Sequence, residues 1–207
     1  MYAAAERGEK AAMFLFEEAN NLMLLSEGLG IDLQKHLDQG QVSIQQIDPA
    51  EMAPAEFIKA VTDAAEAGAR AIVIDSLNGY LNAMPDERFL TTHLHQLLTY
   101  LGQRGVVTLL VGVQPGVLGS SMSTTVDASY IADSVIMLRY FEARGKVRQA
   151  ISVFKKRVGV HERSIRLFNM SAKGIQVGAV LTDFHGILTG APTFNEANCE
   201  EMFGDDE

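Results

Sequence analysis

The chain has 207 residues, of which 47% are hydrophobic and 21% charged, and its formal net charge at pH 7 is -9. One domain usually takes about 100–200 residues, so this composition predicts a single folded domain and excludes disordered and collagen-like chains. The single cysteine, Cys199, excludes an internal disulfide and favours a reducing compartment. No apolar run approaches the roughly 20 residues of a membrane span, so a cytoplasmic protein with no membrane segment is expected.

Apolar runs alternate with helical patterns along the chain, which is typical of an α/β fold with a mostly parallel sheet. The expected strands of this series are residues 11–16, 42–47, 71–75, 106–113 and 134–141. Helices are expected at residues 18–28, 32–37, 54–67 and 86–103. Residues 149–155 and 165–170 alternate between apolar and polar side chains and are expected to form an antiparallel hairpin region.

Two segments differ from this alternation of strand and helix patterns. Residues 114–129 combine glycine, proline and many hydroxyl side chains, which is typical of a long functional loop. Residues 195–207 carry six acids and no base, and we call them the acidic segment. A solvated, disordered tail is the first interpretation of this segment, and a docking segment is the alternative.

Basic residues gather between residues 139 and 173. This stretch contains ten of the seventeen Lys and Arg residues and only two acids, Glu142 and Glu162. The simplest interpretation is a pair of strands with basic solvent faces. The alternative is an anion site, because guanidinium and ammonium groups bind phosphate oxygens strongly. Nucleic acid is disfavoured as a ligand, since the total charge is negative.

Polar side chains follow three of the expected parallel strands: Glu17 and Glu18, then Asp75, then Gln114. Ligands of open parallel sheets bind beyond the carboxyl ends of the strands. Four apolar residues followed by an aspartate is the pattern of a Walker B strand, whose carboxylate holds Mg²⁺ beside a nucleotide's phosphates. A glutamate on the neighbouring strand could accept a proton from an attacking water. The alternatives are a turn-capping Asp75 and a Glu18 that only meets a helix dipole.

Other kinds of catalytic site are not indicated. No Gly-x-Ser-x-Gly elbow occurs, and His93 and His95 point to different faces of a helix. His36 and His185 are expected to be ordinary surface or boundary residues, and no zinc site is expected.

The strand-end acids, the hydroxyl-rich loop and the basic strands together resemble the KaiC family of RecA-like ATPases. The resemblance covers residues 2–194, and its markers are Phe16-Glu17-Glu18 and residues 71–77, 132–140, 153–157 and 187–193. It implies a three-layer α/β RecA-like domain with a mostly parallel central sheet and a C-terminal antiparallel hairpin region. The acidic segment would follow this domain.

The resemblance also implies roles for individual residues. Glu17 and Glu18 match the catalytic glutamate pair and Asp75 the Walker B aspartate, with Glu17 and Asp75 near Mg²⁺ and ATP. In a homo-oligomeric ring, with a hexamer as one candidate, the nucleotide of the adjacent subunit would be contacted by Lys155, Arg157, His161 and Arg163. Signalling partners and a clock-type role are implied without being specified.

Autophosphorylating family members use adjacent Ser and Thr residues in the hydroxyl-rich loop. The matching positions here are Ser129 and Tyr130, and Tyr130 breaks the pair. Thr124 is a second candidate hydroxyl.

One family motif is missing from the 207 residues. The P-loop (Walker A) pattern Gly-x-x-x-x-Gly-Lys-Ser/Thr does not occur, and residues 2–7 are expected to be the last turns of the helix that follows it. Without the amides and lysine of that loop, tight ATP binding in cis is not expected. The strand before the P-loop would also be missing, which leaves neighbouring strands unpaired at about 1–3 kcal/mol per buried group. Self-association, rearrangement or a further segment is expected to fill the gap.

Three functional hypotheses follow. The first is a KaiC-like ATPase domain that is impaired because the P-loop is absent. The second is a pseudo-ATPase that works as an oligomerising or signalling module. The third, a DNA-binding recombinase, is disfavoured by the acidic body and predicts a DNA affinity that falls steeply with salt.

Overall fold

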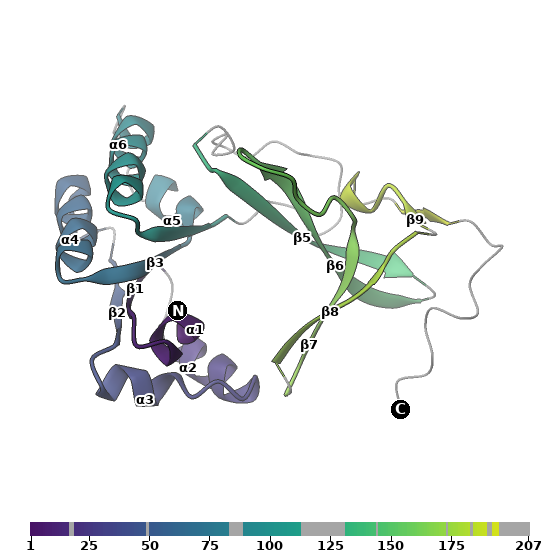
Figure 1. The fold of residues 1–207 in the computed structure, drawn as a ribbon, viewed down its shortest axis with the longest axis horizontal. Coiled ribbons are helices and arrows are strands. Elements are labelled where there is room, and N and C mark those ends of the chain that lie inside the picture. The colour runs from purple at the N-terminus through teal and green to yellow at the C-terminus, as the bar shows by residue number, and fades with distance from the viewer. Residues whose placement is uncertain are drawn as a thin grey trace. The chain divides into compact units, whose positions relative to one another are not determined.

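The computed structural model describes residues 1–16, 19–48, 50–82, 89–112, 131–143, 145–172, 174–182, 184–189 and 192–194. The chain divides into two compact units, Met1–Val113 and Gln114–Glu207 (Figure 1). Within the described ranges, no helix is both long and apolar enough to cross a membrane.

The first unit is a parallel sheet with helices on its two faces. Its elements in chain order are α1 (Tyr2–Glu6), β1 (Lys10–Leu15), α2 (Ala19–Gly28), α3 (Leu33–Asp38), β2 (Val42–Gln46), α4 (Pro54–Glu66), β3 (Ala69–Asp75), α5 (Leu77–Asn82), α6 (Leu90–Gln103) and β4 (Val107–Val111). The strand order is β2-β1-β3-β4, and every neighbouring pair is parallel. The predicted parallel α/β sheet is therefore confirmed.

Apolar side chains on both faces of β1 and β3 explain the layers. Ala11 packs in one cluster with α1 and α3, whereas Phe14 meets Phe57 of α4 edge to face, with ring centroids 5.8 Å apart. Successive residues of a strand point to opposite faces, so a run of apolar residues requires cover on both sides. Figure 1 shows α4, α5 and α6 on one side of this sheet and α1, α2 and α3 on the other.

The strand β4 lies at the edge of the described sheet. It pairs with β3 and with no other described strand. Val107, Leu109 and Val111 are exposed on it, although each is apolar. Uncapped apolar edges of this kind are templates for pairing with another strand.

Element boundaries follow local chemistry that sequence patterns resolve only in part. β3 begins two residues before its predicted start, because Gly68 (φ +99°) ends α4 and Ala69 is already buried. α5 was not predicted, since its six residues hold a glycine and two asparagines. Its first turn is capped by Ser76, whose Oγ accepts a hydrogen bond of 3.1 Å from Gly79 N.

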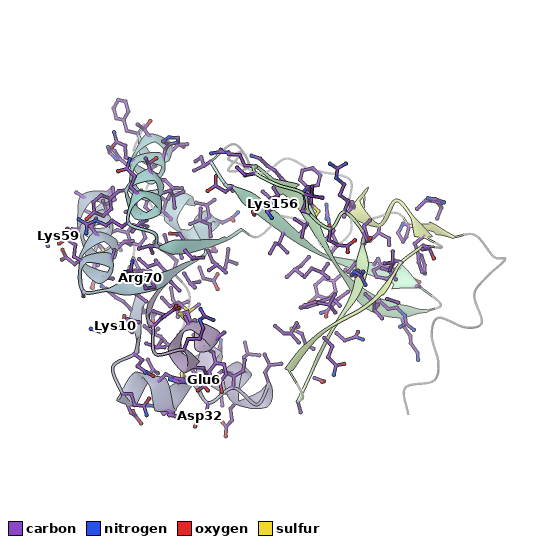
Figure 2. The ribbon with its side chains drawn as sticks, in the orientation of Figure 1. Glu6, Lys10, Asp32, Lys59, Arg70 and Lys156 are labelled. Atoms are coloured by element: carbon purple, nitrogen blue, oxygen red, sulfur yellow. The ribbon has the colours of Figure 1, made fainter. Side chains whose placement is uncertain are left out.

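His36 is buried, with 2% of its surface exposed, so its expected place at the surface or boundary was wrong. Its Nε2 lies 2.8 Å from Glu6 Oε1 and its Nδ1 lies 2.7 Å from Gln41 Oε1. The ring also meets Tyr2 edge to face at 5.3 Å. A histidine whose polar atoms are bonded on both sides can be buried at little cost, and here it joins α1 to α3 (Glu6 is labelled in Figure 2).

We expect His36→Ala to lower the free energy of unfolding of the first unit by about 1–3 kcal/mol, since it leaves Glu6 and Gln41 without this partner. Chemical denaturation followed by circular dichroism measures the loss. The matched control is Lys35→Ala, which removes only an exposed ion pair of 3.5 Å to the same Glu6 oxygen and should cost less than about 1 kcal/mol. Equal losses in the two variants would contradict the assignment.

The second unit is an antiparallel sheet with a short appended ribbon. Its elements are β5 (Ser134–Ala143), β6 (Lys146–Lys156), β7 (Arg166–Ser171), β8 (Gly174–Val180), β9 (Phe184–His185), the 3-10 helix η2 (Ile187–Thr189) and β10 (Thr193–Phe194). The main sheet has the order β5-β6-β7-β8, and β9 pairs with β10. Both units together confirm the predicted fold class, a RecA-like α/β sheet followed by antiparallel strands.

Two details of the hairpin region differ from the prediction. Residues 134–141 were grouped with the parallel strands, but β5 pairs antiparallel with β6 along its whole length. A short turn at Gly145 (φ +69°) makes this pairing possible. The small core of this unit lies at the turn end of the hairpin, where Phe141 and Ala150 pack with residues of the β9–η2 segment.

Candidate functional site

The carboxyl ends of the parallel strands meet at one edge, as the sequence predicted. Asp75, the last residue of β3, is level with Leu15 on β1 and with Val111 on β4. Beyond the ladder, Phe16 N donates a hydrogen bond of 2.7 Å to Asp75 O. The main chain that leads into Glu17 is therefore fixed beside Asp75.

Asp75 is the described member of the predicted acidic set. Its side chain is partly exposed, and the following peptide bond to Ser76 is cis. Glu17 and Glu18 lie outside the described residues, so their catalytic and metal-binding roles remain predictions. The same holds for Ser129, Tyr130 and Thr124 in the hydroxyl-rich loop.

The donors at this edge suit Mg²⁺ bound together with a phosphate. The described ranges contain no group of three or more His, Cys, Asp and Glu side chains that could hold a metal. Mg²⁺ is usually held through one or two carboxylates plus phosphate oxygens and water, rather than by an all-protein cage. One strand-end carboxylate at Asp75 fits this arrangement, and Glu17 would be the second.

The predicted basic residues lie at the end of β6 and in the loop of residues 157–165 (Lys156 marks this end in Figure 2). Arg157 is held on the hairpin, because its backbone N donates to Asp133 O at 2.7 Å and its Nη1 lies 3.1 Å from Asp133 Oδ1. Lys155 is partly exposed on β6. Neither residue is among those that line the cavity containing His161 and Arg163.

His161 and Arg163 do come together. They line a cavity of about 380 Å³ whose other walls include Ser152, Phe154, Ile165 and Leu188. Ser152 is 6% exposed, and its buried Oγ has no hydrogen-bond partner in the structure. The lining of the cavity thus combines two nitrogen-bearing side chains, a buried hydroxyl and apolar side chains. Sequence reasoning missed Ser152, since the residues that line the cavity with it, such as Leu188, lie far from it along the chain.

The carboxylate of Glu162 is bonded to Ser164 and to Arg166 of β7, and not to Arg163. Ser164 donates to Glu162 Oε1 through its hydroxyl and, at 3.2 Å, through its backbone N. Arg166 Nη2 lies 3.4 Å from Oε2. The Ser164 hydroxyl first, then its backbone N–H and Arg166, hold the pKa of Glu162 below its ordinary value of 4.5.

A carboxyl group whose pKa is lower in the folded state stabilises that state above its unfolded pKa, and the contribution is lost as the pH falls through the folded value. We therefore expect the Ser164 amide resonance to titrate with a midpoint below 4.5. Nuclear magnetic resonance across the acid range measures it. In Ser164→Ala the Glu162 carboxyl resonance should titrate closer to 4.5, and an unchanged midpoint would contradict the stated cause.

Comparison with known proteins shows the family to which this sequence belongs. The family model of the KaiC ATPases matches residues 1–181. The chain belongs to the KaiC family of ATPases. It is 26% identical over 207 residues to the circadian clock protein KaiC3 of Synechocystis sp., covering 99% of this chain and 41% of that protein. It is 27% identical over 192 residues to the circadian clock oscillator protein KaiC of Acaryochloris marina, covering 92% of this chain and 37% of that protein.

Family membership confirms the predicted resemblance and the coarse function, a KaiC-like ATPase domain. A third relative, the circadian clock oscillator protein KaiC of Synechococcus elongatus, is 26% identical over 192 residues, or 37% of its length. The chain therefore spans about two fifths of the length of the curated relatives it matches. KaiC ATPases as a family bind nucleotide and Mg²⁺, which agrees with the carboxylate at the end of β3.

Proposed function

We propose that this chain is a KaiC-type ATPase domain that contributes two half-sites to nucleotide binding between copies. Asp75, with Glu17 as the base beside it and Glu18 as the second glutamate, would face Mg²⁺ and the phosphates. Lys155, Arg157, His161 and Arg163 would contact the nucleotide of the adjacent copy. The proposal rests chiefly on one observation, the hydrogen bond from Phe16 to Asp75 at the carboxyl edge of the sheet.

The charge arrangement of the second unit supports the contact in trans. Two acids near the predicted basic residues are already bonded, Asp133 to Arg157 and Glu162 to Arg166. His161 and Arg163 have no bonded partner among the described side chains. An arginine that is not paired with an acid of its own unit, next to a histidine N–H, is suited to bind a phosphate from outside that unit.

Catalysis is proposed to be impaired in these 207 residues. The Walker A pattern is absent from the sequence, so the backbone amides, the lysine and the hydroxyl that cradle phosphates are not supplied by it. Autophosphorylation at Ser129 or Thr124 would require the same bound nucleotide. A homo-oligomeric ring, a cytoplasmic location and signalling partners belong to this proposal.

The test is Mg²⁺-dependent binding of a fluorescent ATP analogue, together with ATP hydrolysis, by the full chain. Asp75→Asn and Glu17→Gln should each reduce the Mg²⁺-dependent part of binding. The control is Asp63→Asn, an exposed carboxylate on α4 that pairs with Lys59. Saturable, Mg²⁺-dependent hydrolysis that Glu17→Gln leaves untouched would sink the proposal.

A pseudo-ATPase assembly module is the second candidate, and the edge strand β4 favours it. Val107 and Leu109 are 63% and 49% exposed on a strand without a described partner on its outer side. Size-exclusion chromatography with and without ATP separates the two functions, since assembly that ignores nucleotide supports the module. Leu109→Lys should weaken that assembly, whereas Leu25→Lys, at a 65% exposed site on α2, should not.

A further inference from the structure

The cavity of the second unit has the chemistry of a site for an anion with an adjacent apolar group. Arg163 supplies positive charge and N–H donors, His161 supplies a ring N–H, and Ser152 supplies a buried hydroxyl without a partner. Phe154, Ile165 and Leu188 supply apolar surface next to them. Its volume of about 380 Å³ lies at the small end of the range of ligand pockets, about 300–1,000 Å³.

The acidic segment has the complementary chemistry. Residues 195–207 hold six carboxylates and no base, and Glu200-Glu201 is followed directly by Met202-Phe203. Two carboxylates next to two apolar side chains match the charge and the walls of the cavity. The ten basic residues between residues 139 and 173 add attraction over a longer range.

The start of the acidic segment is tied to the same part of the unit. β10 (Thr193–Phe194) pairs with β9, and the turn between these two strands contains η2, which carries the cavity residue Leu188. Glu200 and Glu201 follow Phe194 by only six and seven residues, a reach of roughly 20 Å. A tether this short gives an effective concentration on the order of millimolar, so a weak contact can be well populated.

We propose that the acidic segment docks into this cavity of its own chain, with Glu200 and Glu201 at Arg163 and His161 and with Met202 and Phe203 on the apolar walls. Docking would cover two of the residues proposed to contact nucleotide, so the segment would act as an intramolecular competitor. That regulatory consequence rests on the proposed function, whereas the docking itself does not.

The single cysteine allows a direct test by disulfide trapping. Val160→Cys places a thiol on the cavity loop at a residue that is 96% exposed and does not line the cavity. The matched control is Val147→Cys, 74% exposed at the other end of β6. That end of β6 packs on Phe184 and Ile187. An acidic segment that does not dock in the cavity should therefore reach residue 147 at least as readily as residue 160. The rate of intrachain disulfide formation with Cys199 is measured on non-reducing gels at low ionic strength.

We expect Val160→Cys to cross-link about tenfold faster than Val147→Cys. Arg163→Glu, and separately Glu200→Gln with Glu201→Gln, should slow the Val160→Cys reaction by about tenfold, the usual size of a charge-assisted contact. The second pair of changes leaves Arg163 and its loop unaltered, so it tests docking even if Arg163→Glu disturbs the loop.

Equal rates at the two cysteine positions would overturn the proposal, as would rates that ignore both charge changes. Covalent dimers in place of an intrachain product would also overturn it, because the occupant would then be a second copy. No nucleotide is present in these experiments, so a negative result leaves the proposed ATPase function to its own test.

Discussion

Phe57→Ala is expected to lower the free energy of unfolding of the first unit by about 3–5 kcal/mol. Phe57 is fully buried on α4 and touches three other aromatic rings. Its ring centroid lies 5.4 Å from that of Phe16 and 5.1 Å from that of Tyr80, and Phe14 completes the group. The ring therefore joins α4 to the end of β1 and to α5, and truncation leaves a cavity that close-packed neighbours cannot fill.

Denaturation by urea, followed by circular dichroism, measures this loss. Phe89→Ala is the matched control, because Phe89 is 60% exposed at the start of α6 and should change stability by less than about 1 kcal/mol. We also expect Phe57→Ala to weaken any binding that depends on Asp75, since Phe16 would lose a packing partner. A loss below about 1 kcal/mol would contradict the proposed role of the aromatic cluster.

Gly79→Ala is expected to destabilise the same unit by about 1–3 kcal/mol through overpacking. A Cβ at residue 79 would lie 2.5 Å from Phe16 Cβ and 3.0 Å from Phe16 Cγ. The clash involves atoms next to the backbone, so α5 or the end of β1 has to shift. Because Phe16 donates to Asp75 O, the shift would reach the candidate site itself.

The matched control is Gly102→Ala. Both glycines lie in helices, but a Cβ at residue 102 would meet nothing within 4 Å. That change should stabilise α6 by about 0.5–1 kcal/mol, the difference in helix propensity between glycine and alanine. If thermal unfolding moved in the same direction for both variants, close packing at Gly79 would not be the cause.

Much of the fold could be predicted because its signals are local. The apolar runs that became β1 and β3 need cover on both faces, which predicts a parallel sheet with helices around it. Asp75 could be placed at the carboxyl edge for the same reason. The strand β5 was grouped wrongly because an apolar run does not reveal its partner, and only the turn at Gly145 makes that partner β6.

The site residue at a strand end, Asp75, could be predicted from sequence, whereas residues buried by distant parts of the chain could not. His161 and Arg163 were selected together, and the structure brings them to one cavity. Ser152 and His36 were missed or misjudged because their burial depends on distant residues; His36 meets Glu6, thirty residues away in sequence. No pattern within one segment carries such information.

The two sheets differ in how far apart their paired residues lie along the chain. Leu15 pairs with Asp75, and Asp75 with Val111, so each contact closes a long loop before it gains any stabilisation. Ala143 pairs with Lys146 across a tight turn. A hairpin of this kind can form within about 1–10 microseconds. We therefore expect the ribbon of β5 and β6 to gain order early during refolding and the parallel sheet to set the overall rate.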